Sequence, residues 1–206
     1  MAGLISIVLE PQKGQNILDC CSAPGGKTTY IAELINDKGN IEAWDIHEHR
    51  VKLVQENAKR LGITCINAKV QDAIIYNEEN KDKYDKILLD VPCLGLGVLK
   101  RKPDIKWTRN KEDIEEISKL QMQILDTCSK YLKKGGELVY STCSILKSEN
   151  EEIIENFVQK NYDFEIVNLN DKFKKFNQDK YKSSSYIKLF QDSENDGFFI
   201  AKLRKK

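Results

Sequence analysis

Residues 16–27 read NILDCCSAPGGK, and this stretch decides the fold. The apolar pair Ile17 and Leu18 stands directly before Asp19, and we predict a short buried strand over residues 16–20. The Pro-Gly-Gly sequence at residues 24–26 then predicts a turn, and the apolar spacing along residues 27–35 predicts a helix. A strand, a glycine turn and a helix in this order form the repeating unit of parallel α/β sheets. Ligands bind outside the carboxyl ends of such strands, so we expect a ligand site at this turn.

The same alternation of β-rich runs and amphipathic helical stretches continues along the chain. We predict the other strands at residues 40–44, 64–67, 84–91, 137–142, 164–169 and 197–203. We predict the other helices at residues 4–9, 48–61, 112–132 and 148–159. This pattern favours a mostly parallel sheet with helices on both faces.

Two helix ends and one loop carry signals of their own. The sequence KKGG at residues 133–136 predicts a C-terminal cap for the long helix, with cations near the helix dipole. Ser148 and Glu151 have the spacing of a capping box, which predicts that the following helix begins at Ser148. The polar stretch at residues 170–186 predicts a mobile loop.

The composition indicates one domain of a globular protein. Of 206 residues, 40% are hydrophobic and 32% are charged, which is enough to build one core under a polar surface. The chain has six cysteines but no export signal, which argues against a disulfide framework. It contains no C-x-x-C pair, so its cysteines do not indicate a metal site. The longest apolar runs are far too short to cross a bilayer. We therefore expect a monomer that works in the cytoplasm without a metal ion.

An aspartate follows each of the first three predicted strands, at Asp19, Asp45 and Asp72. The glycine turn is neither a G-x-G-x-x-G dinucleotide motif nor a P-loop, because Cys21 stands where a P-loop needs glycine. S-adenosylmethionine fits the three carboxylates better, since its ribose hydroxyls and adenine amine donate hydrogen bonds. Each aspartate alone could be an ordinary turn residue. Their position on successive strand ends favours the cofactor site.

Two cysteines follow the fourth and fifth predicted strands. Cys93 lies in the turn DVPCLGLG, and Cys143 lies in STCS. Neighbouring parallel strands bring their carboxyl ends together, so we expect both thiols to face one crevice beside the cofactor. A free cysteine is most often a small buried apolar residue, an interpretation that suits Cys65 and Cys128 better. Cys93 and Cys143 lie in turns, where side chains reach solvent.

Taken together, these motifs resemble the catalytic domain of the RNA cytosine-5 methyltransferase family, of the bacterial small-subunit (16S) rRNA methyltransferase B type. The resemblance rests on CSAPGGKT, the acid of AWDIH, the DVPC-x-G-x-G turn, RKPDIKW, LVYSTCS with ENE after it, and DGFFIAKLRK. Several motifs in one order are far more specific than any single motif. The family implies a class I S-adenosylmethionine-dependent methyltransferase fold. This fold is Rossmann-like, with a seven-stranded, mostly parallel sheet, helices on both faces and an antiparallel last strand.

The resemblance also implies roles for individual residues. Asp45 would hold the cofactor ribose, Asp72 would lie on the adenine side, and Asp90 would lie between the cofactor and the target base. One position departs from the family, because Leu94 stands where serine is common and brings no hydroxyl group. The turn that would wrap the cofactor consists of Cys21, Ser22, Ala23, Pro24, Gly25, Gly26 and Lys27.

The expected chemistry is covalent catalysis by a cysteine. Thiolate addition at cytosine C6 turns the weakly nucleophilic C5 into an enamine carbon that attacks the cofactor methyl group. A carboxyl group at ring N3 favours this addition, so we expect Asp90 there, with its pKa raised by burial. Spacing does not choose between the two thiols. DNA cytosine-5 enzymes use the Pro-Cys, here Cys93, whereas the RNA family uses the Thr-Cys, so we expect attack by Cys143 and release assisted by Cys93.

A basic segment follows the Pro-Cys turn. Lys100, Arg101 and Lys102 begin a stretch over residues 99–111 in which Asp104 is the single acid. We expect these three cations beside the path of the RNA, although a charge run is often only a solvated face. Full-length members of the family carry an N-terminal RNA-binding region. We therefore expect residues 1–206 to be one catalytic domain whose residues 1–15 are a lead-in helical segment truncated from such a region.

Three alternatives stay open at the level of sequence. The substrate could be tRNA rather than 16S rRNA, because specificity depends on appended RNA-binding regions and substrate shape. The chain could be a nucleotide-binding or RNA-binding module without catalysis, in which two motif cysteines would be needless. A thiol hydrolase is disfavoured, because neither His47 nor His49 belongs to a strand-end motif that would place it as a base.

Overall fold

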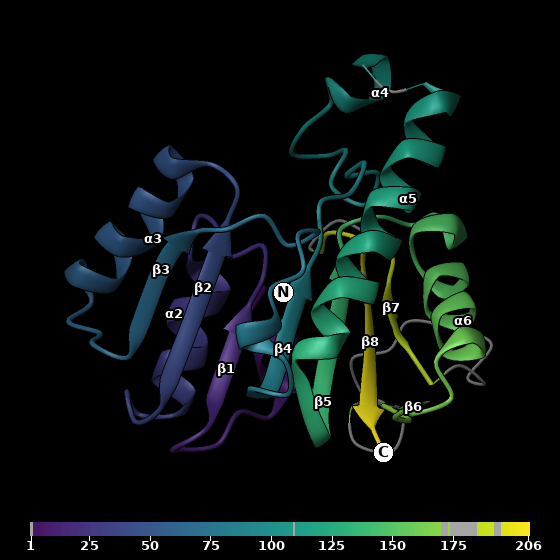
Figure 1. Cartoon of the computed structure of the whole chain (residues 1–206). Helices are drawn as coiled ribbons and strands as arrows, with labels where there is room; N and C mark the ends of the chain where they lie inside the picture. Colours follow the sequence, from purple (N-terminus) through teal and green to yellow (C-terminus); the bar gives the residue numbers. More distant parts are fainter. Residues whose placement is uncertain (1, 109, 170–172, 174–184, 192–194) are drawn as a thin grey trace.

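The computed structural model describes residues 2–108, 110–169, 173, 185–191 and 195–206. Within these residues, one sheet has the order β3-β2-β1-β4-β5-β8-β6, and β7 also pairs with β8 (Figure 1). The strands are β1 (Asn16–Asp19), β2 (Asn40–Asp45), β3 (Ile66–Val70), β4 (Tyr84–Asp90), β5 (Leu132–Thr142), β6 (Phe164–Ile166), β7 (Ile187–Leu189) and β8 (Phe198–Lys205). The helices are α1 (Ala2–Leu9), α2 (Gly26–Leu34), α3 (Glu48–Arg60), α4 (Ile105–Thr108), α5 (Lys111–Cys128) and α6 (Glu151–Lys160), with the 3₁₀ turns η1 (Glu78–Asn80), η2 (Ser129–Tyr131) and η3 (Lys147–Glu149).

The eight strands occupy seven positions across the sheet. Strands β1 to β5 run parallel to one another, and β8 runs antiparallel to β5. Both β6 and β7 pair with the other edge of β8, β6 along residues 203–205 and β7 along residues 198–200. The expected mostly parallel sheet with an antiparallel last strand is thus confirmed, and β7 is an unpredicted eighth strand. Three residues are too few to reveal a strand by their periodicity.

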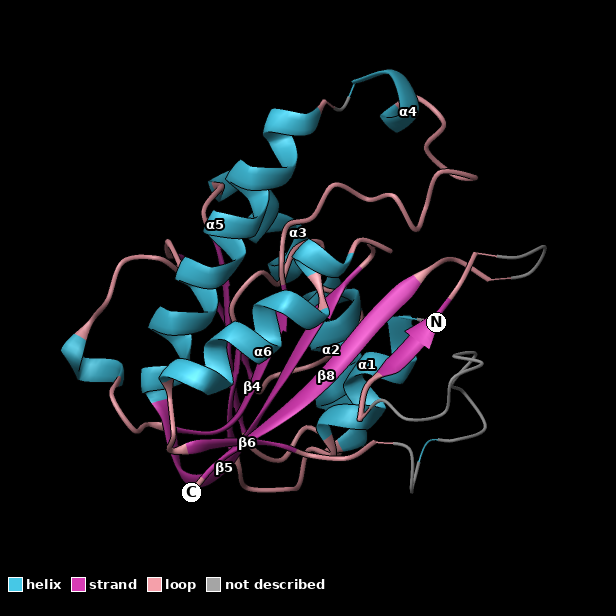
Figure 2. Ribbon diagram, turned by 90° about the vertical axis from the view of Figure 1, so that its right-hand side faces the viewer, coloured by secondary structure: helices cyan, strands magenta, loops and turns pink. Residues whose placement is uncertain are grey.

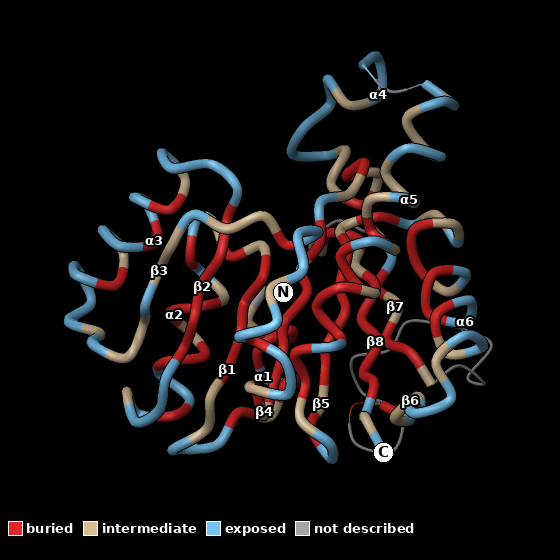
Figure 3. Tube along the Cα trace, in the orientation of Figure 1, coloured by how far each residue is buried: buried red, intermediate tan, exposed pale blue. Residues whose placement is uncertain are grey.

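Alternate residues of the central strands supply two apolar layers, as the period of two in a strand requires. Leu18 and Ile87 belong to the core that includes residues of α5 and α6. Their neighbours Ile17 and Leu88 belong to the core that includes residues of α1 and α2. Figure 2 shows the sheet between these helices, and Figure 3 shows that buried residues concentrate along the strands. Each large aliphatic side chain buried in this way contributes roughly 1.5–3 kcal/mol.

The predicted C-terminal end of the long helix is wrong. Helix α5 ends at Cys128, the turn η2 follows, and β5 already begins at Leu132. Lys133 is therefore a strand residue, and its Nζ pairs with Asp85 at 2.7 Å rather than with the end of a helix. Tyr131 and Leu132 are fully buried in the core beneath α5, so their apolar character extended the helical pattern beyond the helix.

The predicted capping box at Ser148 is also wrong. Ser148 lies inside η3, and Glu151 is the first residue of α6, which follows Asn150. A capping box occurs instead at α5, where Asn110 and Asp113 exchange hydrogen bonds of 3.0 and 3.1 Å. The third strand begins at Ile66 rather than at residue 64. Most of the loop predicted at residues 170–186 lies outside the described residues.

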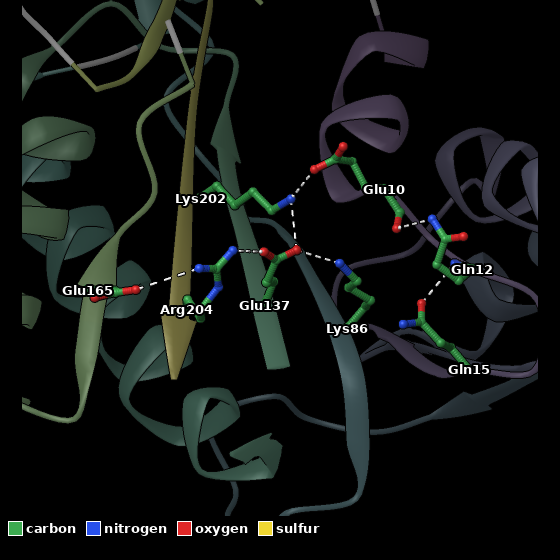
Figure 4. Close-up of polar contacts among 8 residues, drawn as sticks. All are labelled: Glu10, Gln12, Gln15, Lys86, Glu137, Glu165, Lys202 and Arg204. Carbon is green, nitrogen blue, oxygen red and sulfur yellow. Dashed lines mark hydrogen bonds and ion pairs between the residues drawn. The ribbon is translucent and has the colours of Figure 1, made fainter. Parts of the chain in front are cut away.

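A buried ion-pair network joins α1 to the last strand (Figure 4). Lys202 of β8 is almost fully buried, and its Nζ lies 2.7 Å from Glu10 and 2.8 Å from Glu137. Glu137 also pairs with Lys86 of β4 and, at 2.8 Å, with Arg204. An unpaired buried ammonium group would cost several kcal/mol, so the two carboxylates are what make this position of Lys202 tenable.

Glu137 is expected to stabilise the fold in a pH-dependent way. Burial raises its pKa, but hydrogen bonds from Lys202, Lys86 and Arg204 outweigh burial and lower the pKa from 4.5 to about 2. The stabilisation is therefore present above about pH 4.5 and is lost as the pH falls toward 2. We expect Glu137→Gln to lower the free energy of unfolding in urea by about 3 kcal/mol at neutral pH. The difference in the free energy of unfolding between Glu137→Gln and the wild type should shrink as the pH falls from about 4.5 toward 2.

Glu165→Gln is the matched control. The Glu165 side chain is 47% exposed and reaches Arg204 only at 3.8 Å. Its loss should therefore cost less than about 0.5 kcal/mol. Equal losses in the two variants, or a difference for Glu137→Gln that does not change with pH, would contradict the role given to Glu137.

Candidate active site

The turn between β1 and α2 is held in place by neighbouring elements. Ser22 donates from its backbone N and from its Oγ to the carbonyl oxygen of Trp44, at 2.8 and 3.0 Å. Asn57 of α3 donates to the carbonyl oxygen of Pro24 at 2.9 Å. The turn is therefore shaped by β2 and α3, and the Ser22 hydroxyl serves this purpose.

Gly25 and Gly26 have different functions within the turn. Gly25 has φ +99°, and a Cβ added there would lie 3.2 Å from the Val54 Cα, so glycine is required by both conformation and space. A Cβ added at Gly26 would meet nothing within 4 Å. Gly26 starts α2, so open space lies against the amino end of a helix, where backbone N–H groups are unpaired.

Asp19, at the end of β1, carries an unsatisfied buried oxygen. The residue is 1% exposed, and its Oδ2 accepts a hydrogen bond of 2.7 Å from Thr28 Oγ1. Its Oδ1 has no hydrogen-bond partner among the described residues. Burial raises the pKa of Asp19 to about 7, with Asp90 adding to the shift and Thr28 opposing it. A buried acceptor without a partner beside the open glycine turn fits a ligand that brings donor groups.

The ends of β2 and β3 provide two further carboxylates. Asp45 is buried, accepts from the His47 backbone N at 3.1 Å and pairs with Arg50 at 3.3 Å. Ile46, directly after it, is exposed and offers an apolar surface beside the acid. Asp72 follows β3 and accepts a hydrogen bond of 3.0 Å from the Ile74 backbone N. Adjacent acids with an apolar neighbour suit a nucleoside, which combines hydroxyl donors with a flat ring.

Asp90, at the end of β4, lies in an ion pair. Its Oδ2 is 2.6 Å from Lys27 Nζ, and its Oδ1 accepts a hydrogen bond of 2.8 Å from Ser141 Oγ. Burial disfavours the charge on Lys27, but Asp90 outweighs burial and raises the pKa of Lys27. The Asp90 side chain is 25% exposed. Asp90 is therefore a partly exposed, ion-paired carboxylate, because Lys27 turns back from the glycine turn to pair with it.

The two predicted thiols meet. Cys93 Sγ lies 2.9 Å from Cys143 Sγ, and the backbone N of Cys143 donates to Cys93 Sγ at 3.3 Å. The hydrogen bond from Cys93 lowers the pKa of Cys143, and Lys27 acts in the same direction. The same hydrogen bond raises the pKa of Cys93, as do burial and the nearby Glu149. The contact therefore favours the charged form of Cys143 over that of Cys93.

Two glycines fix the distance between the cysteine turns. The backbone N of Gly97 donates to the carbonyl oxygen of Cys143 at 2.9 Å, and Gly197 donates to the carbonyl oxygen of Gly97 at 2.7 Å. A Cβ added at Gly97 would lie 2.3 Å from the Gly197 carbonyl oxygen. Gly97 and Gly197 belong to the motifs DVPC-x-G-x-G and DGFFIAKLRK, but the sequence alone does not indicate their role. Only the contact between distant segments reveals that role.

The basic segment lies beyond the carboxyl ends of the parallel strands, around α4 (Figure 1). Lys100 and Lys102 are exposed, and the surrounding segment is exposed as well (Figure 3). Arg101 pairs with the buried Asp196 at 2.9 Å, which ties the segment to the start of β8. Arg101 therefore has a structural partner that the sequence did not predict.

The described part of the chain has neither a metal-ligand cluster nor a membrane-spanning helix. No cluster of three or more His, Cys, Asp or Glu side chains there has an arrangement suited to a metal ion. None of the helices in the described segments combines the length and apolar character needed to span a membrane.

The chain is similar to known rRNA methyltransferases. Residues 6–204 match the model of the family described as 16S rRNA methyltransferase RsmB/F. The chain is 41% identical to the probable ribosomal RNA small subunit methyltransferase B of Bacillus subtilis (strain 168), over 98% of this chain and 46% of the relative. It therefore spans about half the length of the curated relatives that it matches.

Solved structures give the same result. The structure of NSun6 from Pyrococcus horikoshii with SFG matches at a TM-score of 0.84 and 34% identity, over 99% of this chain and 51% of that chain. The S-adenosylmethionine-dependent O-methyltransferase from Thermotoga maritima has the same fold, at a TM-score of 0.57 and 16% identity over 98% of this chain and 63% of that chain. The chain belongs to the 16S rRNA methyltransferase RsmB/F family and has the class I fold of S-adenosylmethionine-dependent methyltransferases.

Proposed function

We propose that this chain methylates cytosine C5 in RNA, with S-adenosylmethionine as methyl donor and 16S rRNA as substrate. The observation that carries the proposal is the contact between Cys93 and Cys143, 2.9 Å apart at the ends of neighbouring strands. A thiolate with a hydrogen-bonding thiol beside it supports covalent attack followed by release. The name of the Bacillus subtilis relative supports the choice of RNA.

The residues of the first three strand ends would hold the cofactor. Asp45 would accept from the ribose hydroxyls and Asp72 from the adenine side, while the turn from Cys21 to Lys27 would lie along the rest of the molecule. The unpartnered Oδ1 of Asp19 and the open space at Gly26 support this assignment. When bound, S-adenosylmethionine supplies an electrophilic methyl group.

The chain's own residues would carry the steps around methyl transfer. Cys143 would add as thiolate to C6 of the target cytosine. Asp90 would face ring N3, and the Lys27 ammonium group, 2.6 Å from Asp90 Oδ2, would supply positive charge there. After methylation, water takes the C5 proton, the electron pair of that bond restores the C5–C6 double bond, and the bond between C6 and Cys143 Sγ breaks with release of the thiolate. Cys93 would donate to the departing sulfur, from which its own Sγ lies only 2.9 Å away in the free protein. A better-stabilised thiolate is a better leaving group.

The surface around α4 would contact RNA outside the target base. Lys100, Arg101 and Lys102 would lie near phosphates, with Arg101 shared with Asp196. Trp107 on α4 is 81% exposed, and Lys106 Nζ lies 5.2 Å from its ring centre. An exposed indole among cations suits an unpaired nucleotide, because every base can stack on it. We further propose that the protein acts as a monomer in the cytoplasm and without a metal ion.

Asp45→Ala should weaken binding of S-adenosylmethionine by about 1–3 kcal/mol, the cost of losing a hydrogen bond to a charged group. Isothermal titration calorimetry measures this directly and needs no RNA. Glu48→Ala removes the same charge from an exposed position three residues along the chain and should leave affinity unchanged. Unaltered affinity in Asp45→Ala would remove Asp45 from the cofactor site.

Replacement of Lys100 and Lys102 by alanine should weaken RNA binding and flatten its salt dependence. Each lost phosphate contact lowers the slope of log K against log salt by about 1. Lys134 and Lys160 are exposed lysines in β5 and at the end of α6, and their double replacement is the matched control. An unchanged slope in the first variant would return its lysines to an ordinary solvated face.

Replacement of Cys143 and replacement of Cys93 should give opposite results in a test for a covalent protein–RNA complex. Cys143→Ala should abolish methylation and the adduct, because the attacking group is gone. Cys93→Ala should accumulate a protein–RNA adduct that survives denaturing electrophoresis and depends on S-adenosylmethionine. The assay uses an rRNA fragment whose binding has first been measured, with tRNA in parallel. The reverse pattern, with adduct in Cys143→Ala alone, would transfer the nucleophile to Cys93.

A further inference from the structure

Glu149 is a carboxylate buried behind the two cysteine turns. It ends η3, between β5 and α6, and is 0% exposed. Its Oε1 accepts a hydrogen bond from Ser144 Oγ. Its Oε2 accepts from the Leu94 backbone N and from Gln121 Nε2, both at 3.0 Å. Among the ion pairs of the described residues, none involves Glu149, so uncharged donors alone satisfy this buried carboxylate.

Two of these three donors come from the segments that carry the thiols. Ser144 is the residue after Cys143, and Leu94 is the residue after Cys93. The same carboxylate thus binds the immediate neighbour of each cysteine. Gln121 of α5 strengthens the connection, because its Nε2 also donates to the carbonyl oxygen of Pro92 at 2.8 Å.

A neutral residue at this position would change the hydrogen bonds and remove the charge. Burying a charge without a cation is costly, and hydrogen bonds to the charged group must offset that cost. Glutamine at position 149 would turn one oxygen into an NH₂ group, which would face either the Leu94 N–H or the Ser144 hydroxyl. The hydroxyl can rotate to accept, but the backbone N–H cannot. The charge of Glu149 also acts on Cys93, where it favours the protonated thiol.

We propose that Glu149 is a positioning residue that holds Cys93 against Cys143 by binding the residue that follows each cysteine. Its importance for catalysis rests on the proposed function, but the contact that it sets exists in the protein without RNA. Besides the Cys93 thiol, two charged groups, Asp90 and Lys27, act on Cys143. Neither Asp90 nor Lys27 forms a hydrogen bond or ion pair with Glu149 among the described residues, so the effect of Glu149 on Cys143 passes through Cys93 and the two turns.

The test measures the thiols in the free protein. We expect Glu149→Gln to raise the thiol pKa of Cys143 and so to slow its alkylation by iodoacetamide at neutral pH, by about tenfold per unit of pKa. Peptide mapping by mass spectrometry isolates Cys143 among the six cysteines, and a pH profile gives its midpoint. Diamide, a two-electron thiol oxidant, should also form the Cys93–Cys143 disulfide more slowly in the variant.

Glu152→Gln is the matched control, because Glu152 is an exposed acid on α6. It should leave both thiol measurements unchanged, and Glu149→Asp should restore part of the wild-type pH profile by restoring the charge. A folded Glu149→Gln that binds S-adenosylmethionine and has the wild-type alkylation profile and disulfide rate would overturn the proposal. A wild-type profile in that variant leaves the adduct test of the cysteines unaffected, so the two proposals fail separately.

Ser144→Ala covers the case in which Glu149→Gln does not fold. It removes the Oε1 contact, together with the hydrogen bond of 3.3 Å that Ser144 Oγ accepts from the Leu146 backbone N, and leaves the donors of Leu94 and Gln121 in place. We expect a smaller shift of the Cys143 profile in the same direction. No shift in folded Ser144→Ala, together with an unfolded Glu149→Gln, would reduce Glu149 to a residue needed for folding and overturn its positioning role.

Discussion

The pairing of β4 with β5 is the constraint on which the site depends. The parallel register places Asp90 opposite Ser141, so both strands end at the same level. Each strand is followed within three residues by a cysteine, and the two thiols consequently meet across one strand spacing. A shift of the register by one residue would turn one of the two strands over and separate its turn from the other. The buried apolar layers on both faces of the sheet oppose such a shift.

Charge is distributed unevenly around this pairing. On the carboxyl side of the sheet, within the described segments, one Asp19 oxygen has no hydrogen-bond partner and the Glu149 carboxylate accepts only from neutral donors. On the opposite side, Glu137 is surrounded by three cations. The first arrangement tunes neighbouring groups at a cost in stability, whereas the second stabilises the fold. This division agrees with the general tendency of functional sites to keep polar groups that a purely structural core would replace.

Sequence patterns predicted the elements that repeat and missed those defined by distant contacts. The NILDCCSAPGGK stretch revealed β1, its turn and α2, because a short apolar run, a Pro-Gly-Gly turn and helical spacing are local signals. The end of α5 was misplaced, since Tyr131 and Leu132 are apolar for the sake of the core beneath the helix. The meeting of Cys93 and Cys143 followed from strand order alone. The pairing of Lys27 with Asp90 did not, because the direction of a long side chain is not encoded locally.

The position of β8 has a consequence for the order in which the protein can fold. This strand is the last in the chain, yet it lies between β5 and β6 and supplies the only edge to which β6 and β7 attach within the described residues. Its Lys202 meets Glu10 across 192 residues of sequence. Contacts this distant are slow to form, because the loop-closure entropy precedes any gain. During synthesis, β5 would therefore expose an unpaired edge until residues 198–205 leave the ribosome, and that edge is the natural place for a chaperone to act or for aggregation to begin.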